Sequence, residues 1–354
     1  MGNILIRKCP ESKYYIAFDR KNGTFIRMGE NDVDPFCNFR GPELLDISIT
    51  NFCERECDFC YRHSHKSGHS LAFNDYADLM FQARKAGVLQ VALGGGNPNQ
   101  HPQFVEILKC TRDHSIIPSY TTNGQGLTEE IYLATKKYCG AMAVSWYEPY
   151  TEAEETVNQA GSYEIKINIH FLLSKRTLPA AIDLLENRPD LLEKINALVF
   201  LNYKPVHSSP ALCLTDGEDI RLFFELIKNT KKCKIGFDSC MISYLPLMGS
   251  ELAVETVDFC EAGRFSAFVS ENMLLYPCSF MNDITDNGVD LRTFSLEEGW
   301  KNGDEFIKMR QRLQCRGSQQ HAIPACVTCQ DYEMCRGGCT VFNINRCRDL
   351  SVAV

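Results

Sequence analysis

The chain has no long apolar run, no run of lysine and arginine, and no N-terminal targeting pattern. Its most apolar stretches, such as residues 169–173 and 197–201, are far shorter than the roughly 20 residues that span a bilayer. The net charge is −8, which argues against a general affinity for nucleic acid. Residues 4–6 are too few to form the apolar part of a signal peptide. We therefore expect a cytoplasmic protein that binds neither membranes nor nucleic acid.

Cysteine, by contrast, is abundant, with 18 in 354 residues. Disulfides do not persist in a reducing compartment, so clustered cysteines there are expected to hold metal. One group follows an apolar segment and contains Cys53, Cys57 and Cys60; a second, larger group lies near the C-terminus. The other eight cysteines are scattered, and we expect most of them to be buried thiols.

Between residues 44 and 238 the sequence alternates between strand patterns and helix patterns. Strands are predicted at residues 44–50, 89–93, 116–121, 141–146, 166–173, 197–202 and 235–238. Helices are predicted between Asn74 and Gly87, at 104–114, from Thr128, near 152–160, at 177–186 and around 220–227. Such repeats predict an α/β fold with a parallel sheet that curves into a partial (β/α)6 TIM-type barrel. In these folds the chemistry collects on loops after the C-terminal ends of strands.

The first cysteine group has the spacing CxxxCxxC and follows the strand predicted at residues 44–50. Three thiolates can bind three irons of a [4Fe–4S] cluster and leave the fourth iron open. The run resembles the signature of the radical S-adenosylmethionine (radical SAM) enzymes, including the aromatic Phe59 before the third cysteine. The resemblance implies that the open iron binds SAM and that one electron cleaves SAM to a 5′-deoxyadenosyl radical. That radical abstracts a hydrogen from the substrate inside the barrel.

Three further segments resemble SAM-binding elements of this family, and a fourth offers candidate SAM contacts. The glycine edge, Gly94-Gly95-Gly96-Asn97-Pro98, resembles the GGEP element that holds the SAM amino group, with Asn97 in place of the usual acid; a plain tight turn is the alternative. Asn123 lies in a TNG turn, and Ser145 takes the place of a serine that reaches the ribose or carboxylate. Asn168 and His170 are candidates to face the nucleoside, and for both a buried core side chain is the alternative.

The second cysteine group resembles the SPASM domain, a C-terminal extension that carries two auxiliary [4Fe–4S] clusters. A zinc ribbon is the alternative, but seven cysteines are too many for one zinc and awkward for two. The resemblance assigns Cys326, Cys329, Cys335 and Cys347 to an outer cluster, and Cys260, Cys278 and Cys339 to an inner one. A hairpin predicted at residues 265–276 and a helix containing Trp300 and Phe306 agree with this domain.

The inner cluster lacks a fourth assigned ligand. Cys240, just beyond the last predicted strand, is the first candidate, with Cys315 and Cys233 behind it. The site could instead stay open or bind a substrate thiolate. Cys240 could also give a hydrogen atom to a substrate radical with Asp238 as a base, or be a buried bystander.

Residues 14–18 and 24–27, joined through Asn22-Gly23, predict a β-hairpin that covers the open edge of the barrel. The expected domains are therefore an N-terminal extension (1–43), the radical SAM partial barrel (44–240) and the SPASM domain (241–354).

SPASM relatives mostly modify peptides, so the resemblance implies oxidative modification of a peptide or protein, as in the maturases of ribosomally made peptides (RiPPs) or of sulfatases. The product would contain a crosslink, a thioether or a related change. The expected partners are this substrate, a separate leader-peptide-binding protein, and an electron donor such as flavodoxin or ferredoxin. Two alternatives stay open: a radical SAM dehydrogenase or rearrangement enzyme for a small molecule such as a carbohydrate, and an iron–sulfur redox or structural protein without radical chemistry.

Overall fold

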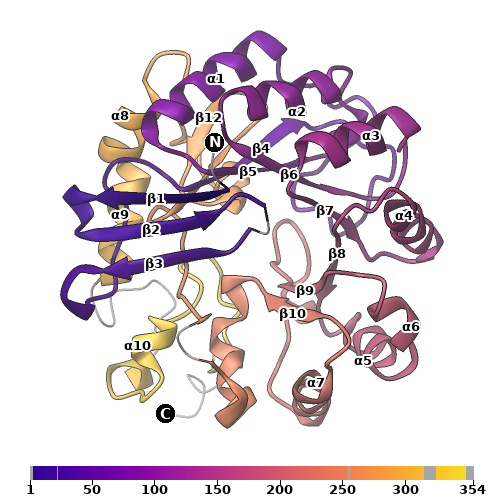
Figure 1. Cartoon of the computed structure of the whole chain (residues 1–354). Coiled ribbons are helices and arrows are strands. Elements are labelled where there is room, and N and C mark those ends of the chain that lie inside the picture. Colours follow the sequence, from indigo (N-terminus) through magenta and orange to yellow (C-terminus); the bar gives the residue numbers. More distant parts are fainter. Residues whose placement is uncertain (1–2, 22, 254–255, 315–323, 348–354) are drawn as a thin grey trace. The chain divides into compact units, whose positions relative to one another are not determined.

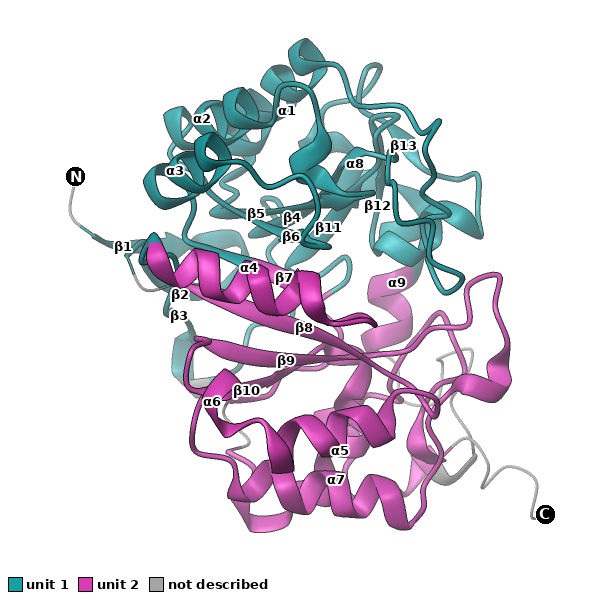
Figure 2. Cartoon of the chain, turned by 90° about the vertical axis from the view of Figure 1, so that its right-hand side faces the viewer, with its two compact units in different colours: residues 1–142, 163–165, 262–308 teal, residues 143–162, 166–261, 309–354 magenta. Residues whose placement is uncertain are grey.

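The computed structural model describes residues 3–21, 23–253, 256–314 and 324–347. The chain forms two compact units (Figure 2). Unit 1 comprises residues 1–142, 163–165 and 262–308, and unit 2 comprises residues 143–162, 166–261 and 309–354. The units do not follow the three sequence segments predicted above, and that division into domains stays a prediction.

Unit 1 contains the first three strand–helix repeats (Figure 1). They are β4 (Leu44–Thr50), α1 (Phe73–Ala86), β5 (Gln90–Gly95), α2 (Phe104–Asp113), β6 (Ile117–Thr122) and α3 (Glu129–Tyr138). The strands pair in parallel, with Leu45 opposite Val91 and Val91 opposite Pro118. One face of α1 is buried, as its apolar spacing predicts, but α1 begins at Phe73 and Asn74 does not cap it. The Thr128 hydroxyl does cap α3, where it accepts a hydrogen bond from the Ile131 N–H.

Unit 2 continues the same pattern. Strand β7 (Ala141–Ser145) runs from unit 1 into unit 2 and is followed by α4 (Thr151–Ser162), β8 (Ile167–Leu173), α5 (Leu178–Asn187), α6 (Pro189–Leu192), β9 (Ala197–Asn202), α7 (Glu218–Asn229) and β10 (Lys234–Phe237). Within this unit β8, β9 and β10 form a parallel sheet in that order. The α/β fold with parallel strands predicted from the sequence is therefore confirmed.

Residues 262–308 add three strands and a helix to unit 1. The strands are β11 (Ser266–Val269), β12 (Leu274–Tyr276) and β13 (Val289–Asp290), and β11 and β12 form the predicted hairpin. Strand β11 also pairs in parallel with β4, which the sequence did not predict. The single helix predicted around Trp300 and Phe306 is wrong: α8 (Leu296–Asn302) and α9 (Asp304–Gln314) are separated at Gly303, whose backbone is extended.

The N-terminus forms a three-stranded sheet, which contains the predicted hairpin and adds a strand before it. Its strands are β1 (Ile4–Cys9), β2 (Tyr14–Asp19) and β3 (Phe25–Gly29), in that order and antiparallel, and β2 and β3 form the hairpin. Its inner face packs against Leu89, Ile117 and Phe265, which lie at the N-terminal ends of β5, β6 and β11. The sheet thus lies below the N-terminal ends of strands, and the expectation that it covers a sheet edge is wrong.

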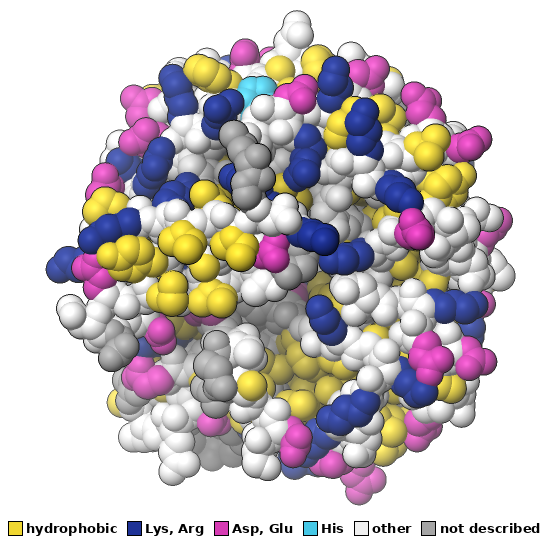
Figure 3. Space-filling model, viewed as in Figure 1, with side chains coloured by type: hydrophobic (Ala, Val, Ile, Leu, Met, Phe, Trp, Pro, Cys, Tyr) yellow, Lys and Arg dark blue, Asp and Glu magenta, His cyan; other side chains and the backbone are white. Residues whose placement is uncertain are grey.

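The outer face of the N-terminal sheet carries exposed apolar side chains, visible over β1–β3 in Figure 3. They are Ile4, Ile6, Ile26 and Met28. Apolar side chains that gather on an exposed sheet face are typical of surfaces that another chain covers.

The remaining elements are 3-10 helices and one short α-helix. They are the 3-10 helices at Pro10–Ser12, Glu30–Asp32, Pro98–Gln100, Pro210–Leu212, Ser239–Glu251, Ser279–Asp283 and Pro324–Val327, and α10 (Tyr332–Cys335). No helix in the part of the chain that the structure describes is long and apolar enough to cross a membrane.

Candidate functional site

The three cysteines of the CxxxCxxC motif lie in one loop directly after β4, as predicted. Cys53, Cys57 and Cys60 are all half-buried, as is Phe59 beside them. Backbone hydrogen bonds fold this cysteine loop (residues 51–70): the Cys53 N–H donates to the His65 carbonyl, and the Cys60 N–H to the Cys57 carbonyl. The loop therefore brings the three thiols to the same end of the strand.

The environment of Cys57 shows that the other two thiols lie close to it. Burial raises the pKa of Cys57 to about 11, Arg55 opposes this rise, and the neighbouring Cys60 and Cys53 add to it. Three adjacent thiols with no fourth cysteine in the loop are the donor set that an iron–sulfur cluster with one open iron requires.

The glycine edge lies beside the cysteine loop. Gly96 N–H donates to the Thr50 carbonyl (2.6 Å), and a Cβ at Gly96 would lie 2.0 Å from the Phe52 carbonyl oxygen. Gly95 has φ +109°, a conformation that favours glycine. A Cβ at Gly94, by contrast, would meet nothing within 4 Å. Packing thus requires glycine at positions 95 and 96. At position 94 the space next to the backbone is open.

Two of the three asparagines assigned to SAM, Asn97 and Asn123, make hydrogen bonds with each other's segments. Asn97 accepts from the Thr122 hydroxyl (3.1 Å) and the Asn123 N–H (3.2 Å), and its own amide donates to the Gln125 carbonyl (2.9 Å). The Asn123 side chain donates to the Cys53 sulfur (3.6 Å). These contacts join the loops after β4, β5 and β6, and the SAM contacts of both side chains stay predictions.

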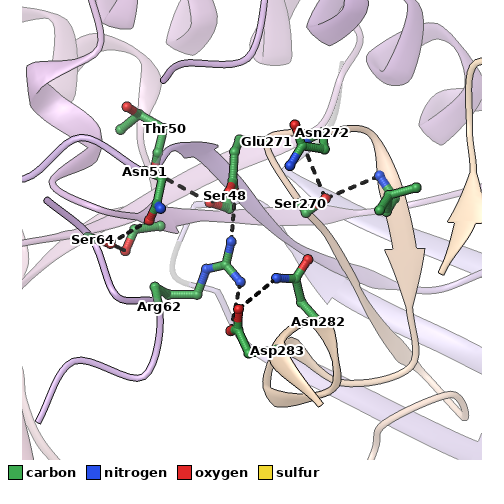
Figure 4. Close-up of polar contacts among 12 residues, drawn as sticks. Ser48, Thr50, Asn51, Arg62, Ser64, Ser270, Glu271, Asn272, Asn282 and Asp283 are labelled. Atoms are coloured by element: carbon green, nitrogen blue, oxygen red, sulfur yellow. Dashed lines mark hydrogen bonds and ion pairs between the residues drawn. The ribbon is translucent and has the colours of Figure 1, made fainter. Parts of the chain in front are cut away.

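A buried ion network that the sequence did not reveal holds the end of the cysteine loop (Figure 4). Arg62 pairs with Glu271 (2.7 Å) and Asp283 (3.1 Å), and only 1% of its side chain is exposed. Glu271 also accepts a hydrogen bond from the Ser48 hydroxyl on β4 (2.6 Å). Arg62 lies two residues after Cys60, so this network ties the loop to the β11–β12 hairpin.

In unit 2, Asp238 and Cys240 lie at the C-terminal end of β10, as predicted. Asp238 accepts from the Asn202 N–H and pairs with Lys204, and the Asn202 side chain donates to the Cys240 carbonyl (2.9 Å). Burial lowers the pKa of Lys204, but Asp238 and Cys240 outweigh it, so this pKa is raised. Cys240 is also hydrogen-bonded to Cys339, and this contact and burial raise its pKa. Lys204 was missed, although it lies just after β9, where the same rule that singled out Asp238 could have found it.

The four cysteines assigned to the outer cluster lie close to one another in unit 2. Burial raises the pKa of Cys335 to about 12, and Cys347, Cys326 and Cys329 contribute to this rise. No three His, Cys, Asp or Glu side chains among the described residues converge on one metal ion. A [4Fe–4S] cluster distributes its thiolates over separate irons, so it does not need that convergence.

The other assigned residues are more dispersed. Of the inner set, Cys260 and Cys339 belong to unit 2 and Cys278 to unit 1, while Cys315 lies outside the described residues. Ser145 ends β7 and is half-buried. Asn168 lies at the beginning of β8, where it accepts a hydrogen bond from Asn196 (2.8 Å). Burial lowers the pKa of His170 to about 4, so its imidazole is neutral. The roles of these residues stay predictions.

Residues 47–198 match the Radical SAM superfamily. This stretch, which contains the cysteine loop, the glycine edge and the TNG turn, is a Radical SAM domain.

Several relatives match most of the chain. The mycofactocin maturase MftC of Mycobacterium ulcerans (strain Agy99) is 24% identical over 324 residues, which are 84% of this chain and 83% of the relative. The AdoMet-dependent heme synthase of Methanosarcina barkeri (strain Fusaro / DSM 804) is 23% identical over 327 residues, 84% of this chain and 90% of the relative.

The fold is also similar to solved structures. The crystal structure of Streptococcus suis SuiB bound to S-adenosylmethionine has a TM-score of 0.72 at 16% identity, and the comparison covers 96% of this chain and 95% of the SuiB chain. SuiB has also been solved bound to the precursor peptide SuiA, again with a TM-score of 0.72 to this chain.

Proposed function

We propose that the protein is a radical SAM enzyme that cleaves SAM reductively and oxidatively modifies a peptide. The observation that carries this proposal is the loop of three adjacent thiols beside a glycine edge with free space at Gly94. A [4Fe–4S] cluster held by Cys53, Cys57 and Cys60 would supply the electron that cleaves SAM to methionine and a 5′-deoxyadenosyl radical. Such low-potential chemistry depends on the cluster's hydrogen bonds and its exposure to solvent.

The chain's own residues hold and shape this site. Gly95 and Gly96 let the backbone after β5 approach the cysteine loop closely, because no Cβ fits there. Gly94 leaves room for the methionine part of SAM. The buried Arg62 fixes the end of the loop, which keeps the third thiol in place relative to the other two.

A peptide is the substrate class that the relatives favour. MftC is a maturase and SuiB has been solved with a precursor peptide. The heme synthase among the relatives supports the alternative, a radical SAM reaction on a small molecule. A protein that uses its clusters only for redox or structural purposes is the remaining alternative, and it predicts no SAM cleavage. We further propose that the enzyme works in the cytoplasm with flavodoxin or ferredoxin as electron donor, and that a separate protein binds the leader of the peptide.

We also propose two auxiliary [4Fe–4S] clusters. The proximity of Cys326 and Cys329 to Cys335 and Cys347, whose pKa values they raise, supports the outer one. For the inner one, we propose Cys240 as the missing fourth ligand, because its side chain contacts Cys339, a ligand assigned to that cluster in the same unit.

The first experiment tests SAM cleavage. The anaerobically reconstituted and reduced protein is incubated with SAM, and 5′-deoxyadenosine is quantified by liquid chromatography and mass spectrometry. We expect the product from the native protein and none from the triple variant Cys53→Ala/Cys57→Ala/Cys60→Ala. A native protein that binds roughly twelve irons, as three [4Fe–4S] clusters require, and forms no product would contradict the proposal.

The second experiment tests the substrate class. A short peptide encoded beside the gene is incubated with the enzyme and analysed by mass spectrometry. Loss of two hydrogens indicates a crosslink or oxidation, and an unchanged mass with altered chirality indicates epimerisation. A peptide that is unaltered in both respects, while a small molecule turns over, would favour the alternative.

The third experiment tests the role of Cys240. We expect Cys240→Ala to lose part of the iron and one of the cluster signals in electron paramagnetic resonance (EPR) spectra. Cys213→Ala is the matched control, because Cys213 is a buried thiol outside both cysteine groups. Equal iron content in the two variants would contradict Cys240 as a ligand.

A further inference from the structure

The side chain of Asn123 is directed at a cluster ligand. Its Nδ2 donates to the Cys53 sulfur at 3.6 Å, and 9% of the residue is exposed. Asn123 follows β6 and Cys53 follows β4, so 70 residues of sequence separate the two partners. The contact is therefore made by the fold and not by local sequence.

The orientation of the Asn123 amide is fixed by a second hydrogen bond. Its Oδ1 accepts from the Gln125 N–H (2.9 Å). Because an N–H donor faces one end of the amide, the oxygen must lie at that end, and the NH2 group must lie at the other, toward Cys53. A flipped amide would leave two donors facing each other.

Asn97 in turn fixes the backbone that carries Asn123. Its Oδ1 accepts from the Asn123 N–H and its Nδ2 donates to the Gln125 carbonyl, so it holds both ends of the turn. Asn97 is buried, with 1% exposed. A carboxylate at this position could accept both hydrogen bonds but could not donate to the Gln125 carbonyl. The asparagine at this place in the glycine edge is thus suited to support the turn.

A hydrogen bond to a ligand sulfur stabilises the reduced state of a cluster, which carries one more negative charge, and so raises its reduction potential. Resting on the radical SAM function proposed above, we propose that Asn123 tunes the potential of the cluster held by Cys53, Cys57 and Cys60 through its N–H···S bond. Asn97 is the positioning residue for this bond. The role differs from a contact to SAM, because it acts on the cluster whether or not SAM is bound.

The test is a potentiometric EPR titration of the reconstituted protein without SAM or peptide. A parallel sample shows which cluster signal changes on SAM addition and so belongs to this site. Asn123→Asp keeps the oxygen that meets the Gln125 N–H but replaces the donor with a negative oxygen. We expect its reduced-to-oxidised ratio at a given potential to fall tenfold or more, which is a shift of the midpoint by about 59 mV or more to lower potential for a one-electron couple. We expect Asn97→Asp to shift the midpoint in the same direction by less.

The matched control is Asn99→Ala. Asn99 lies in the same segment as Asn97, is also buried, and donates to the same Gln125 carbonyl (2.7 Å). Asn99→Ala removes one donor to this carbonyl but leaves Asn97 on the Asn123 N–H, so we expect its midpoint to stay closer to the native value than that of Asn97→Asp. An unchanged midpoint in Asn123→Asp, with weaker SAM binding, would overturn the proposal in favour of a direct SAM contact.

A second measurement uses the native protein, so it tests the hydrogen bond from Asn123 to Cys53 even if the variant binds no iron. Protein labelled with 15N in the asparagine side-chain amide is reduced and examined by pulsed EPR. We expect a 15N coupling to the cluster that disappears in Asn123→Asp or, where that variant binds no iron, in Asn123→Ser. A native protein without such a coupling would refute the proposal. Both measurements omit SAM and peptide, so their outcome is independent of whether 5′-deoxyadenosine forms.

Discussion

Removing the carboxylate of Glu271 is expected to destabilise unit 1 strongly. Glu271 accepts from Arg62 at 2.7 Å and from Ser48 at 2.6 Å, and its side chain is only 6% exposed. Glu271→Ala would leave the Arg62 guanidinium buried with Asp283 as its remaining ion-pair partner. Breaking a buried pair by removing one partner costs about 3–5 kcal/mol. Because Asp283 remains, we expect the lower end, about 3 kcal/mol.

The assay is urea unfolding of the apoprotein under reducing conditions, followed by fluorescence and circular dichroism. The shift in the urea midpoint multiplied by the m-value gives the change in the free energy of unfolding. Asp75→Ala is the matched control, because the ion pair of Asp75 and Arg292 is partly exposed, at 31% and 49%, and exposed pairs contribute about 0–1 kcal/mol. Glu271→Gln keeps the shape and loses only the charge, so it should cost about 1 kcal/mol. A Glu271→Ala protein within about 1 kcal/mol of Asp75→Ala would refute the reasoning.

Three further predictions concern the two units separately. Gly96→Ala should prevent folding of the loops around it, because its Cβ would lie 2.0 Å from a carbonyl oxygen, whereas Gly94→Ala should fold normally and weaken SAM binding; equal thermal stability of the two would contradict this. In Asp238→Ala, Lys204 loses the partner that raises its pKa most, so we expect burial to outweigh the remaining effects of Cys240 and Cys339 and the pKa in the folded state to fall below the unfolded value. The folded state then binds fewer protons, so the stability of this variant should rise from pH 7 toward about 10, a rise absent from the native protein; parallel urea-midpoint curves against pH would show the reasoning to be wrong. Cys335→Ala should lose about four irons and keep SAM cleavage, as iron assay and product analysis would show; full retention of iron would argue against the outer cluster.

The strand–helix repeats and the cysteine loop could be predicted because their signals are local. The buried faces of α1 and α7 follow from apolar residues at helical spacing, and the CxxxCxxC run lies after a strand with alternating apolar residues. The glycine edge was recognised for the same reason: three glycines directly after a strand mark a close approach of backbones.

Features that depend on distant residues could not be predicted in this way. The ion pair of Arg62 and Glu271 joins residues 209 positions apart. Arginine and glutamate are usually exposed, so the sequence alone does not show that these two are buried. The pairing of β11 with β4 likewise depends on the fold. Strand β1 was missed because charged and apolar residues are mixed in it, and its apolar residues at positions 4 and 6 face outward.

The break between α8 and α9 was predictable in principle. Asn302-Gly303 interrupts the helical pattern, and Asp304 and Glu305 are acidic residues of the kind that favour a helix N-terminus. Lys204 belongs to the same group of missed signals, since a charged residue just after a parallel strand is a candidate site residue.

The most direct test of the central proposal is the transfer of a substrate hydrogen to 5′-deoxyadenosine. The reduced enzyme is incubated with SAM and a candidate peptide whose non-exchangeable hydrogens are deuterium, and the isotope content of the 5′-deoxyadenosine is measured by mass spectrometry. The proposal predicts deuterium in this product together with a modified peptide, and no product at all from the triple variant Cys53→Ala/Cys57→Ala/Cys60→Ala. A native protein that carries its clusters and forms no 5′-deoxyadenosine would contradict it.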